Sequence, residues 1–239
     1  MLYTRRRGTA VTLLLTAHPL RAVAMAAALA VAAALAGRSG NEVALVGLTV
    51  LTGQAVLGWF NDVLDRGRDH DLGRPRKPIA QGWIDPGTVA FAASCGVLLV
   101  VPLAVSNGTV AGAAYLGSLA CGALSDLFWR RTWLSWLPWA VGFGLLPAFL
   151  SYGGWGGGVH GGPPTVAMVV LAALLGVGLH FAASLNDLVE DNQAGLRHLP
   201  LRIALRIGAV PLLWLTTVYI ALVLAGMVVA VMMVGLVQG

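Results

Sequence analysis

The chain has 239 residues, of which 58% are hydrophobic and 10% are charged, and its formal net charge is +5. With a mean hydropathy of +0.81, this composition lies outside the range of soluble globular domains and indicates an integral membrane protein. We therefore expect a lipid bilayer around the chain. We expect no nucleic acid among its partners, because the positive charge follows membrane topology.

Seven long apolar runs alternate with short polar segments. A helix needs about 20 residues to cross the hydrocarbon core of a bilayer, and lipid leaves helices as the natural structure for runs of this length. The first run follows three arginines but is too long for a signal peptide, so we expect an uncleaved span. The sequence predicts a single all-α domain over residues 1–239, a polytopic membrane bundle of about seven transmembrane helices at residues 10–36, 43–60, 86–106, 108–125, 134–152, 163–185 and 208–237.

The positive charges are concentrated in the N-terminal tail and in every second loop. Of the 15 Lys and Arg residues, only Arg38 lies in a loop of the opposite set, and Arg21 lies inside the first run. By the positive-inside rule, the N-terminus and the charged loops face the cytoplasm. This orientation depends on Arg5, Arg6, Arg7, Arg66, Arg68, Arg74, Arg76, Lys77, Arg130, Arg131, Arg197, Arg202 and Arg206.

A first acidic cluster follows the second apolar run. Asn61, Asp62, Asp65 and Asp69 have the spacing N-D-x-x-D-x-x-x-D. On a helix of about 3.6 residues per turn, the three aspartates fall on one face. If the helix continues beyond the lipid, it therefore carries one stripe of oxygen ligands.

A second acidic cluster ends the sixth apolar run, in the sequence SLNDLVED. Asp187 and Asp191 are four residues apart, which places them on the same face of a helix. Both clusters begin with Asn-Asp and lie at the predicted cytoplasmic end of an even-numbered span. This similarity suggests that the chain has two related halves.

The two clusters offer carboxylate and amide oxygens, without histidine or thiol. Such a ligand set suits Mg²⁺, which commonly completes its coordination with water and substrate phosphates. The basic residues that follow the first cluster are candidate phosphate contacts: Arg66, Arg68, Arg74, Arg76 and Lys77. The alternative is a solvated helix end with surface ion pairs worth under about 1 kcal/mol each. The presence of two clusters on one predicted side favours the metal site.

These segments resemble those of the UbiA prenyltransferase superfamily of intramembrane aromatic prenyltransferases. His18-Pro19 opens the first span as in many relatives, and Asn61 to Asp69 matches the first Asp-rich motif. The sequence GRPRKPIAQG at residues 73–82 resembles the stretch that follows this motif. The sequence at residues 130–147 resembles the fifth helix of the family, and NDLVEDNQAGLRHLP at residues 186–200 resembles the second Asp-rich motif. The resemblance covers most of the chain.

The resemblance implies a ring of helices around a central cavity, where two Mg²⁺ ions bind the diphosphate of an allylic isoprenoid diphosphate. It implies that the prenyl group is transferred within the membrane to a small acceptor, often an aromatic one. By this resemblance, Asp65, Asp187 and Asp191 are expected to be catalytic, and Arg74, Lys77 and Arg130 to contact the diphosphate. The implied metal ligands are Asn61, Asp62, Asp65, Asp69, Asp187 and Asp191.

The chain departs from the family pattern in one loop and in its length. Relatives usually carry a tyrosine and a lysine, spaced YxxxxK, where this chain has SDLFWR, so Ser125 replaces the tyrosine and Arg130 the lysine. An arginine still binds phosphate, and bidentately, whereas the loss of the phenol concerns the acceptor. The family usually has nine spans, so two helices are expected to be missing, and a homo-oligomer would be one way to supply them.

Aromatic side chains near the clusters are candidates for walls that protect a carbocation from water. Each of them also suits ordinary packing or the lipid interface. The candidates are Trp59, Phe60, Trp129, Trp133, Trp136 and Phe181.

Several other functions remain open from the sequence. Cyclisation of the prenyl cation within one substrate is compatible with the lost tyrosine, and a relative that binds isoprenoid without catalysis is compatible with the short chain. A transporter is disfavoured, because both clusters lie on one predicted side and only Arg21 is charged inside a span. A lipid phosphotransferase of the CDP-alcohol type is disfavoured, because its D-G-x-x-A-R element is absent.

Overall fold

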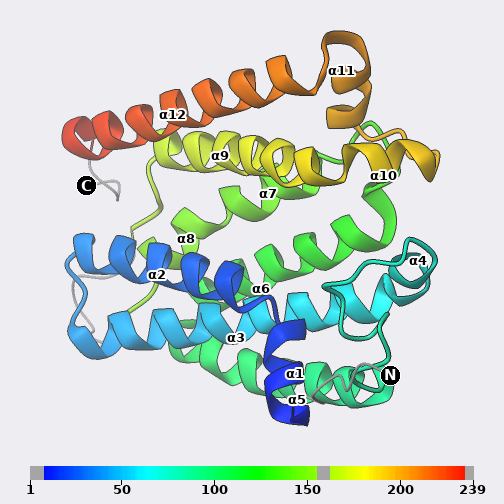
Figure 1. Ribbon diagram of the computed structural model, residues 1–239. Coiled ribbons are helices and arrows are strands. Elements are labelled where there is room, and N and C mark those ends of the chain that lie inside the picture. Colours follow the sequence, from blue (N-terminus) through cyan, green and yellow to red (C-terminus); the bar gives the residue numbers. More distant parts are fainter. Residues whose placement is uncertain (1–7, 155–161, 235–239) are drawn as a thin grey trace. The chain divides into compact units, whose positions relative to one another are not determined.

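The computed structural model describes residues 8–154 and 162–234, and the regular elements in these residues are helices (Figure 1). The chain divides into two compact units, Met1–Leu103 and Ala104–Gly239. Each unit holds one of the two acidic clusters. The predicted all-α membrane bundle is confirmed at the level of its fold class.

The first unit is built around a long helix that carries the first acidic cluster at its end. Helix α2 packs along α3, and Figure 1 shows the two side by side. The elements of this unit are α1 (Thr9–Thr16), α2 (Pro19–Leu35), α3 (Gly40–Leu64), α4 (Arg66–Asp71) and most of α5 (Pro86–Ser106).

The first predicted span is broken at His18. Helices α1 and α2 meet at a bend of 59°. Pro19 is the first residue of α2 and disfavours a right-handed helical conformation in the residue before it, and His18 has a positive φ of 51°. A Cβ at Gly58 of α3 would lie 2.7 Å from the carbonyl oxygen of Ala17. The absence of a side chain at Gly58 therefore lets α3 lie directly against this break.

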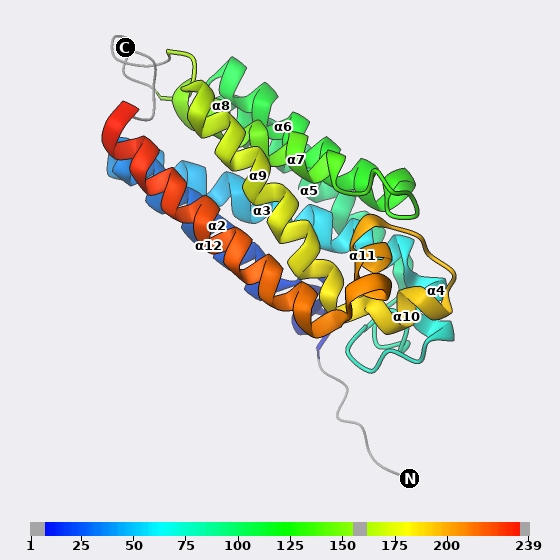
Figure 2. The same ribbon diagram turned by 90° about the horizontal axis from the view of Figure 1, so that it is seen from above.

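The second unit is organised around α9, which packs against α7 on one side and α12 on the other (Figure 2). Gly176 of α9 faces the backbone of Trp139 in α7 so closely that any side chain at this position would clash, as is common where membrane helices approach through small residues. The elements are α6 (Thr109–Leu124), the π-helix η1 (Ser125–Trp129), α7 (Leu137–Gly144), α8 (Leu146–Ser151), α9 (Val166–Ser184), the 3₁₀ helix η2 (Leu185–Asp187), α10 (Leu188–Gln193), α11 (Leu199–Ile207) and α12 (Ala209–Val234).

The number of seven spans is not confirmed. Within the described residues, five helical segments are long and apolar enough to cross a membrane, and a sixth counts if the bent pair α1 and α2 forms one span. The segment predicted at residues 134–152 is instead the shorter apolar stretch Leu137–Ser151, divided into α7 and α8. Pro147 lies in the first turn of α8, where its missing N–H favours a helix start over a continuous helix.

Candidate functional site

The helix that carries the first acidic cluster continues past the apolar part of α3, as predicted, but with a junction. Asp65 closes α3 and also precedes α4. Its N–H donates to the carbonyl of Asn61 and its carbonyl accepts from the N–H of Asp69, both at 2.9 Å. The helical path is therefore almost unbroken from Asn61 to Asp71.

The four predicted ligands of this cluster differ in burial. The residues Asp62 and Asp69 are 2% and 1% exposed, whereas Asn61 and Asp65 are half-buried. The Asn61 side-chain amide donates to Asp65 Oδ2 at 3.4 Å. The predicted stripe thus contains two buried carboxylates beside a more accessible Asn-Asp pair.

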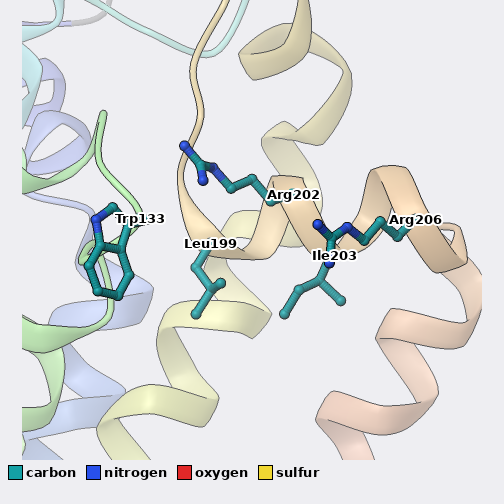
Figure 3. Close-up of a pocket in the computed structure, with 5 residues that line it drawn as sticks. All are labelled: Trp133, Leu199, Arg202, Ile203 and Arg206. Atoms are coloured by element: carbon teal, nitrogen blue, oxygen red, sulfur yellow. The ribbon is translucent and has the colours of Figure 1, made fainter.

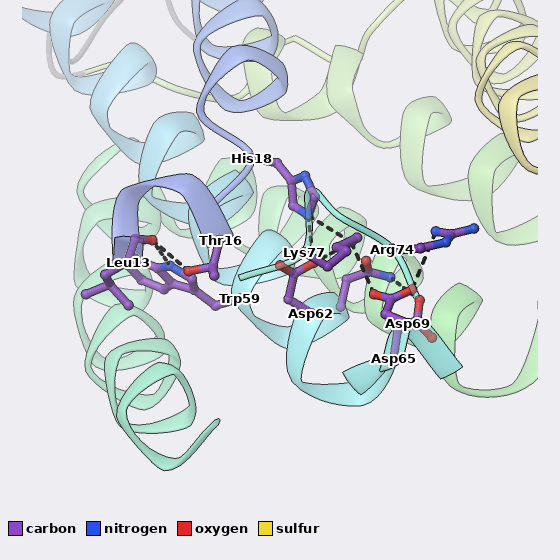
Figure 4. A network of polar contacts seen from close by, with 10 residues as sticks. Leu13, Thr16, His18, Trp59, Asp62, Asp65, Asp69, Arg74 and Lys77 are labelled. Atoms are coloured by element: carbon purple, nitrogen blue, oxygen red, sulfur yellow. Dashed lines mark hydrogen bonds and ion pairs between the residues drawn. The ribbon is translucent and has the colours of Figure 1, made fainter. Parts of the chain in front are cut away.

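Two basic residues that are predicted to contact a diphosphate lie beside the buried carboxylates (Figure 4). Lys77 Nζ is 2.5 Å from Asp62 Oδ1 and 3.7 Å from Asp69 Oδ2. Arg74 Nη1 is 3.5 Å from Asp69 Oδ1. The Lys77 ammonium therefore stands between two carboxylates, in a position where a single cation interacts with both.

The chain returns to the carboxylates through a turn at Gly73, two residues after the end of α4. Gly73 has a φ of 61°, its N–H donates to the carbonyl of His70, and the next N–H, of Arg74, donates to the carbonyl of Asp69. This pair of bonds is a standard helix end with glycine in the left-handed conformation. The loop that follows is anchored by an apolar cluster of Ile79, Ile84 and Val89, packed against Leu13, Trp59 and Val63.

His18 joins this cluster through its side chain, a contact that the sequence analysis missed. Its Nε2 is 2.9 Å from Asp62 Oδ1 and 3.5 Å from Lys77 Nζ. The signal available in the sequence was a histidine directly before Pro19, at the helix break. The residue that adopts the strained left-handed conformation is thus one that contacts the candidate site, where such strain tends to occur.

The charges of this cluster leave room for a further cation. Asp62 Oδ2 is buried and makes no hydrogen bond within the described part of the chain, which is costly for a carboxylate oxygen. Burial raises the pKa of Asp69, Lys77 opposes this shift, and the neighbouring Asp65 adds to it. A hard cation bound to these oxygens would offset both costs.

The metal-ligand geometry itself is not assembled. In residues 8–154 and 162–234, no group of three or more His, Cys, Asp or Glu side chains is placed to hold a metal ion. The oxygen ligands around Asp62 and Asp69 suit Mg²⁺ in their chemistry, but Lys77 stands among them. They fit the ion provided that the ammonium group moves.

In the second unit, the acidic cluster spans η2 and α10. Asp191 in α10 is 4% exposed, whereas Asp187 is half-buried and Asn186 is exposed. The predicted helical pairing of Asp187 with Asp191 is interrupted, because η2 ends at Asp187 and α10 begins at Leu188. The sequence therefore identified the cluster but not the unequal burial of its two aspartates.

His198 contacts the buried aspartate of this cluster. Its Nε2 is 2.9 Å from Asp191 Oδ2. Helix α10 is closed by Gly195, two residues after its last residue, Gln193; Gly195 has a φ of 70°, and the N–H of Leu196 donates to the carbonyl of Asp191. This is the same glycine helix end as in the first cluster. Leu196, directly after this turn, packs in an apolar cluster with Leu188 and Leu201.

A second buried histidine lies close to the start of α11. His180 Nε2 is 2.9 Å from Ser135 Oγ, and the N–H of Leu199 donates to the same oxygen at 3.4 Å. Ser135 is fully buried. Ser135 therefore joins α9 to the residue that follows His198. The local sequence pattern predicts neither a role for this serine nor its bond.

Comparison with known proteins places the chain in a family. The model of the UbiA prenyltransferase family matches residues 22–238, almost the whole chain. The chain belongs to the UbiA prenyltransferase family. The predicted membership, made from the Asp-rich segments, is thus confirmed.

Two solved structures of a UbiA homolog from Archaeoglobus fulgidus resemble this chain. The one bound to GPP and Mg²⁺ has a TM-score of 0.66 and 19% identity, over 89% of this chain and 77% of that chain. The one bound to DMAPP and Mg²⁺ has a TM-score of 0.70 and 17% identity, over 93% of this chain and 78% of that chain. At these identities the likeness shows that the chain has the UbiA fold. No curated protein matches the chain significantly.

The loop in which this UbiA-family chain departs from its relatives forms a π-helix. Ser125 is 6% exposed at its start, and its carbonyl accepts from the N–H of Arg130 at 3.0 Å. Short π-helical turns occur frequently at functional sites. The structure places Arg130 half-buried directly after this turn, and its contact with a diphosphate stays a prediction.

Two of the candidate wall aromatics have distinct surroundings. The Trp59 Nε1 donates to the carbonyl of Leu13 at 3.0 Å, so this side chain ties α3 to α1. Trp133 is 56% exposed and lines a pocket of about 200 Å³ (Figure 3). The pocket combines apolar side chains with two guanidinium groups, a chemistry suited to an anionic group on an apolar chain. Its residues are Trp133, Leu199, Arg202, Ile203 and Arg206.

Proposed function

We propose that this membrane protein transfers a prenyl group from an allylic isoprenoid diphosphate to a small, often aromatic, acceptor, with Mg²⁺ as cofactor. The observation that carries the proposal is the pair of buried carboxylates, Asp62 and Asp69, with Lys77 and Arg74 bound to them and one Asp62 oxygen without a hydrogen bond. Oxygen ligands beside basic side chains are what a metal-bound diphosphate needs. The Archaeoglobus fulgidus homolog was solved with GPP or DMAPP and Mg²⁺, which belong to the same chemical class as the substrate and cofactor proposed here.

The proposed roles follow the two acidic segments. Asp65, Asp187 and Asp191 are proposed as catalytic residues through the metal. Arg74, Lys77 and Arg130 are proposed to contact the diphosphate. The proposed Mg²⁺ ligands are Asn61, Asp62, Asp65, Asp69, Asp187 and Asp191.

Binding of the substrate would exchange cations at the first segment. Lys77 and Arg74 together neutralise Asp62 and Asp69 when no metal is bound. If these oxygens held Mg²⁺, the Lys77 ammonium group and the Arg74 guanidinium would be free to donate to phosphate oxygens. The carboxylates would stay neutralised, and the diphosphate would gain two donors.

The reaction itself is heterolysis of the allylic C–O bond. The electron pair stays with the departing diphosphate oxygen, and Arg74 and Lys77 donate hydrogen bonds to the charge that develops there, which is most effective where water is excluded. Mg²⁺ supplies Lewis-acid stabilisation of the same leaving group. The allylic cation then forms a bond with the nucleophilic atom of the acceptor, which loses a proton.

Cyclisation of the allylic cation is a second candidate, favoured by one observation. Ser125 is buried in the π-helix where relatives carry a tyrosine. If that phenol serves acceptor handling in relatives, its loss is compatible with a reaction that needs no acceptor. The metal and diphosphate chemistry is the same in both cases.

The test is product analysis with purified full-length protein in detergent or nanodiscs. Allylic diphosphates of increasing chain length are incubated with Mg²⁺, with and without a panel of aromatic acceptors, and products are identified by mass spectrometry. Transfer predicts prenylated acceptor, and cyclisation predicts a cyclic hydrocarbon or alcohol without acceptor. Absence of diphosphate release from every substrate would contradict both and leave a non-catalytic isoprenoid-binding role or a transport role.

The orientation in the membrane is part of the proposal. We propose that the N-terminus and both acidic segments face the cytoplasm, because the basic loops lie there by the positive-inside rule. Cysteine variants at the exposed positions Arg76 and Gln193 test this with a membrane-impermeant thiol reagent. Labelling of either variant in intact cells, whose membrane the reagent does not cross, would contradict the orientation.

A further inference from the structure

His198 is a buried polar residue that contacts the proposed ligand Asp191 but is not itself a proposed ligand. Both of its ring nitrogens are engaged: Nε2 lies 2.9 Å from Asp191 Oδ2, and Nδ1 accepts from the N–H of Leu201 at 3.2 Å. The residue is 2% exposed. It precedes α11 as its N-cap, a position usually taken by Ser, Thr, Asn or Asp.

These two bonds fix the tautomer of the ring. A nitrogen that accepts from a backbone N–H carries no proton, so the proton of the neutral imidazole is on Nε2. The Nε2–H group then donates to Asp191 Oδ2. The bond that caps α11 therefore determines that Nε2 faces the carboxylate and that this nitrogen carries the donated proton.

We propose that His198 is a positioning residue, which holds the carboxylate of Asp191 in one orientation for Mg²⁺. The inference rests on the proposed function for the metal. A donor that fixes the plane of a ligating carboxylate lowers the entropy lost on metal binding, and such supporting bonds commonly affect metal affinity by about 10- to 100-fold.

The surroundings of His198 are built to hold it. The next residue, Leu199, donates its N–H to Ser135, which in turn contacts His180. The chain on the other side is fixed by the helix end at Gly195. The ring is thus held from both directions along the chain, as expected for a group that orients another.

A neutral donor at this place has a specific advantage over a cation. In the first segment, Lys77 stands among the carboxylates and must move before Mg²⁺ binds to them. The neutral ring of His198 holds Asp191 without repelling the metal, so it keeps its hydrogen bond when the ion is bound. The second segment is therefore orientated before the metal arrives.

The two bonds of His198 are separated by a crossed pair of variants. In His198→Ser, the hydroxyl still caps α11 but is too short to reach Asp191. In His198→Gln, the terminal amide reaches toward Asp191 and can donate, but no acceptor stands at the position of Nδ1. Mg²⁺ affinity is measured by calorimetry on the full-length protein, and the unfolding temperature is measured in metal-free buffer.

The expected result is a reversal between the two measurements. His198→Ser should unfold near the wild-type temperature and bind Mg²⁺ about 10- to 100-fold more weakly. His198→Gln should unfold at a lower temperature and bind Mg²⁺ more tightly than the serine variant. A serine variant with wild-type Mg²⁺ affinity, or a glutamine variant that binds as weakly as the serine variant, would overturn the inference.

Failure of the proposed function gives a different result. Wild-type protein that binds no Mg²⁺ would overturn the metal assignment itself. The ¹⁵N spectrum of histidine-labelled, metal-free protein then decides the remaining step, with His198→Ser used to assign the signal. A neutral ring protonated on Nε2 supports the orienting bond to Asp191, and a ring protonated on Nδ1 overturns it.

Discussion

The two acidic segments share one local design and differ in the partner of the buried carboxylate. Asp69 and Asp191 each lie four residues before a glycine with positive φ, and each gives its carbonyl to the N–H that follows this glycine. After the glycine, the charged side chain of Lys77 contacts the buried aspartate in the first segment, and His198 contacts it in the second. The sequence pattern D-x-x-x-G thus produces the same backbone turn twice.

The difference separates two ways of keeping a carboxylate buried. The cation Lys77 neutralises Asp62 and contacts Asp69, so the first segment is held together electrostatically without a metal. His198 orients Asp191 through a neutral hydrogen bond. We therefore expect the side chains of the first segment to move more on metal binding. Metal binding by the second segment should depend more on the orientation of Asp191.

The largest effect is expected from removing one carboxylate in either segment. Asp62→Asn and Asp191→Asn should each reduce diphosphate release by about 100- to 1,000-fold, because each removes a proposed ligand of the Mg²⁺ that would stabilise the charge on the leaving group. Diphosphate release from the preferred allylic substrate is the measurement. Asp71→Asn, at an exposed position of the same first segment, is the control and should retain activity. Full activity in either of the first two variants would show that its segment is not needed.

A large effect on stability is expected at Lys77 in the absence of metal. Lys77→Met leaves Asp62 and Asp69 buried without their shared cation and should destabilise the metal-free protein by about 3–5 kcal/mol. Mg²⁺ should restore a large part of this loss, which is measured as a shift in unfolding temperature with and without the ion. The matched control is Arg76→Met, at an exposed neighbouring position. Equal unfolding of the two variants would show that Lys77 is not the counter-ion of the pair.

A smaller effect is expected at the two helix ends. Gly73→Ala and Gly195→Ala place a side chain on residues with φ of 61° and 70°, which costs about 1–2 kcal/mol at each position. Gly67→Ala is the control, because it lies within α4 with no neighbouring atom within 4 Å of an added Cβ, and should be neutral or slightly stabilising. Thermal unfolding compares the three. If the Gly195 variant unfolds like the Gly67 variant, the shared turn is not needed in the second segment.

Local patterns in the sequence were enough to identify the fold class and the acidic residues. The long apolar runs predict helices because lipid leaves few alternatives, and the spacing from Asn61 to Asp69 predicts a helical continuation, which the structure shows with a junction at Asp65. The break at His18 was not anticipated, although Pro19 carries the physical reason for it. The same holds for α7 and α8, where Pro147 divides an apolar run whose length predicts one span.

The contacts of the carboxylates could not be predicted from local patterns. The sequence predicts a phosphate contact for Lys77 but not its contact with Asp62, fifteen residues earlier in the chain, which the structure shows. His18 is 44 residues from Asp62, and Ser135 is 45 residues from His180. Such pairs depend on how helices and loops pack, which spacing within one helix does not determine. The roles of the proposed site residues therefore remain predictions for experiment.

The most direct test of the central claim is calorimetric titration of the full-length protein with an allylic diphosphate. The account predicts binding in the presence of Mg²⁺, and loss of binding when Mg²⁺ is removed by chelation. It also predicts loss of binding in both Asp62→Asn and Asp191→Asn. Wild-type affinity after chelation, or wild-type affinity in either variant, would contradict the claim that both acidic segments bind the diphosphate through Mg²⁺.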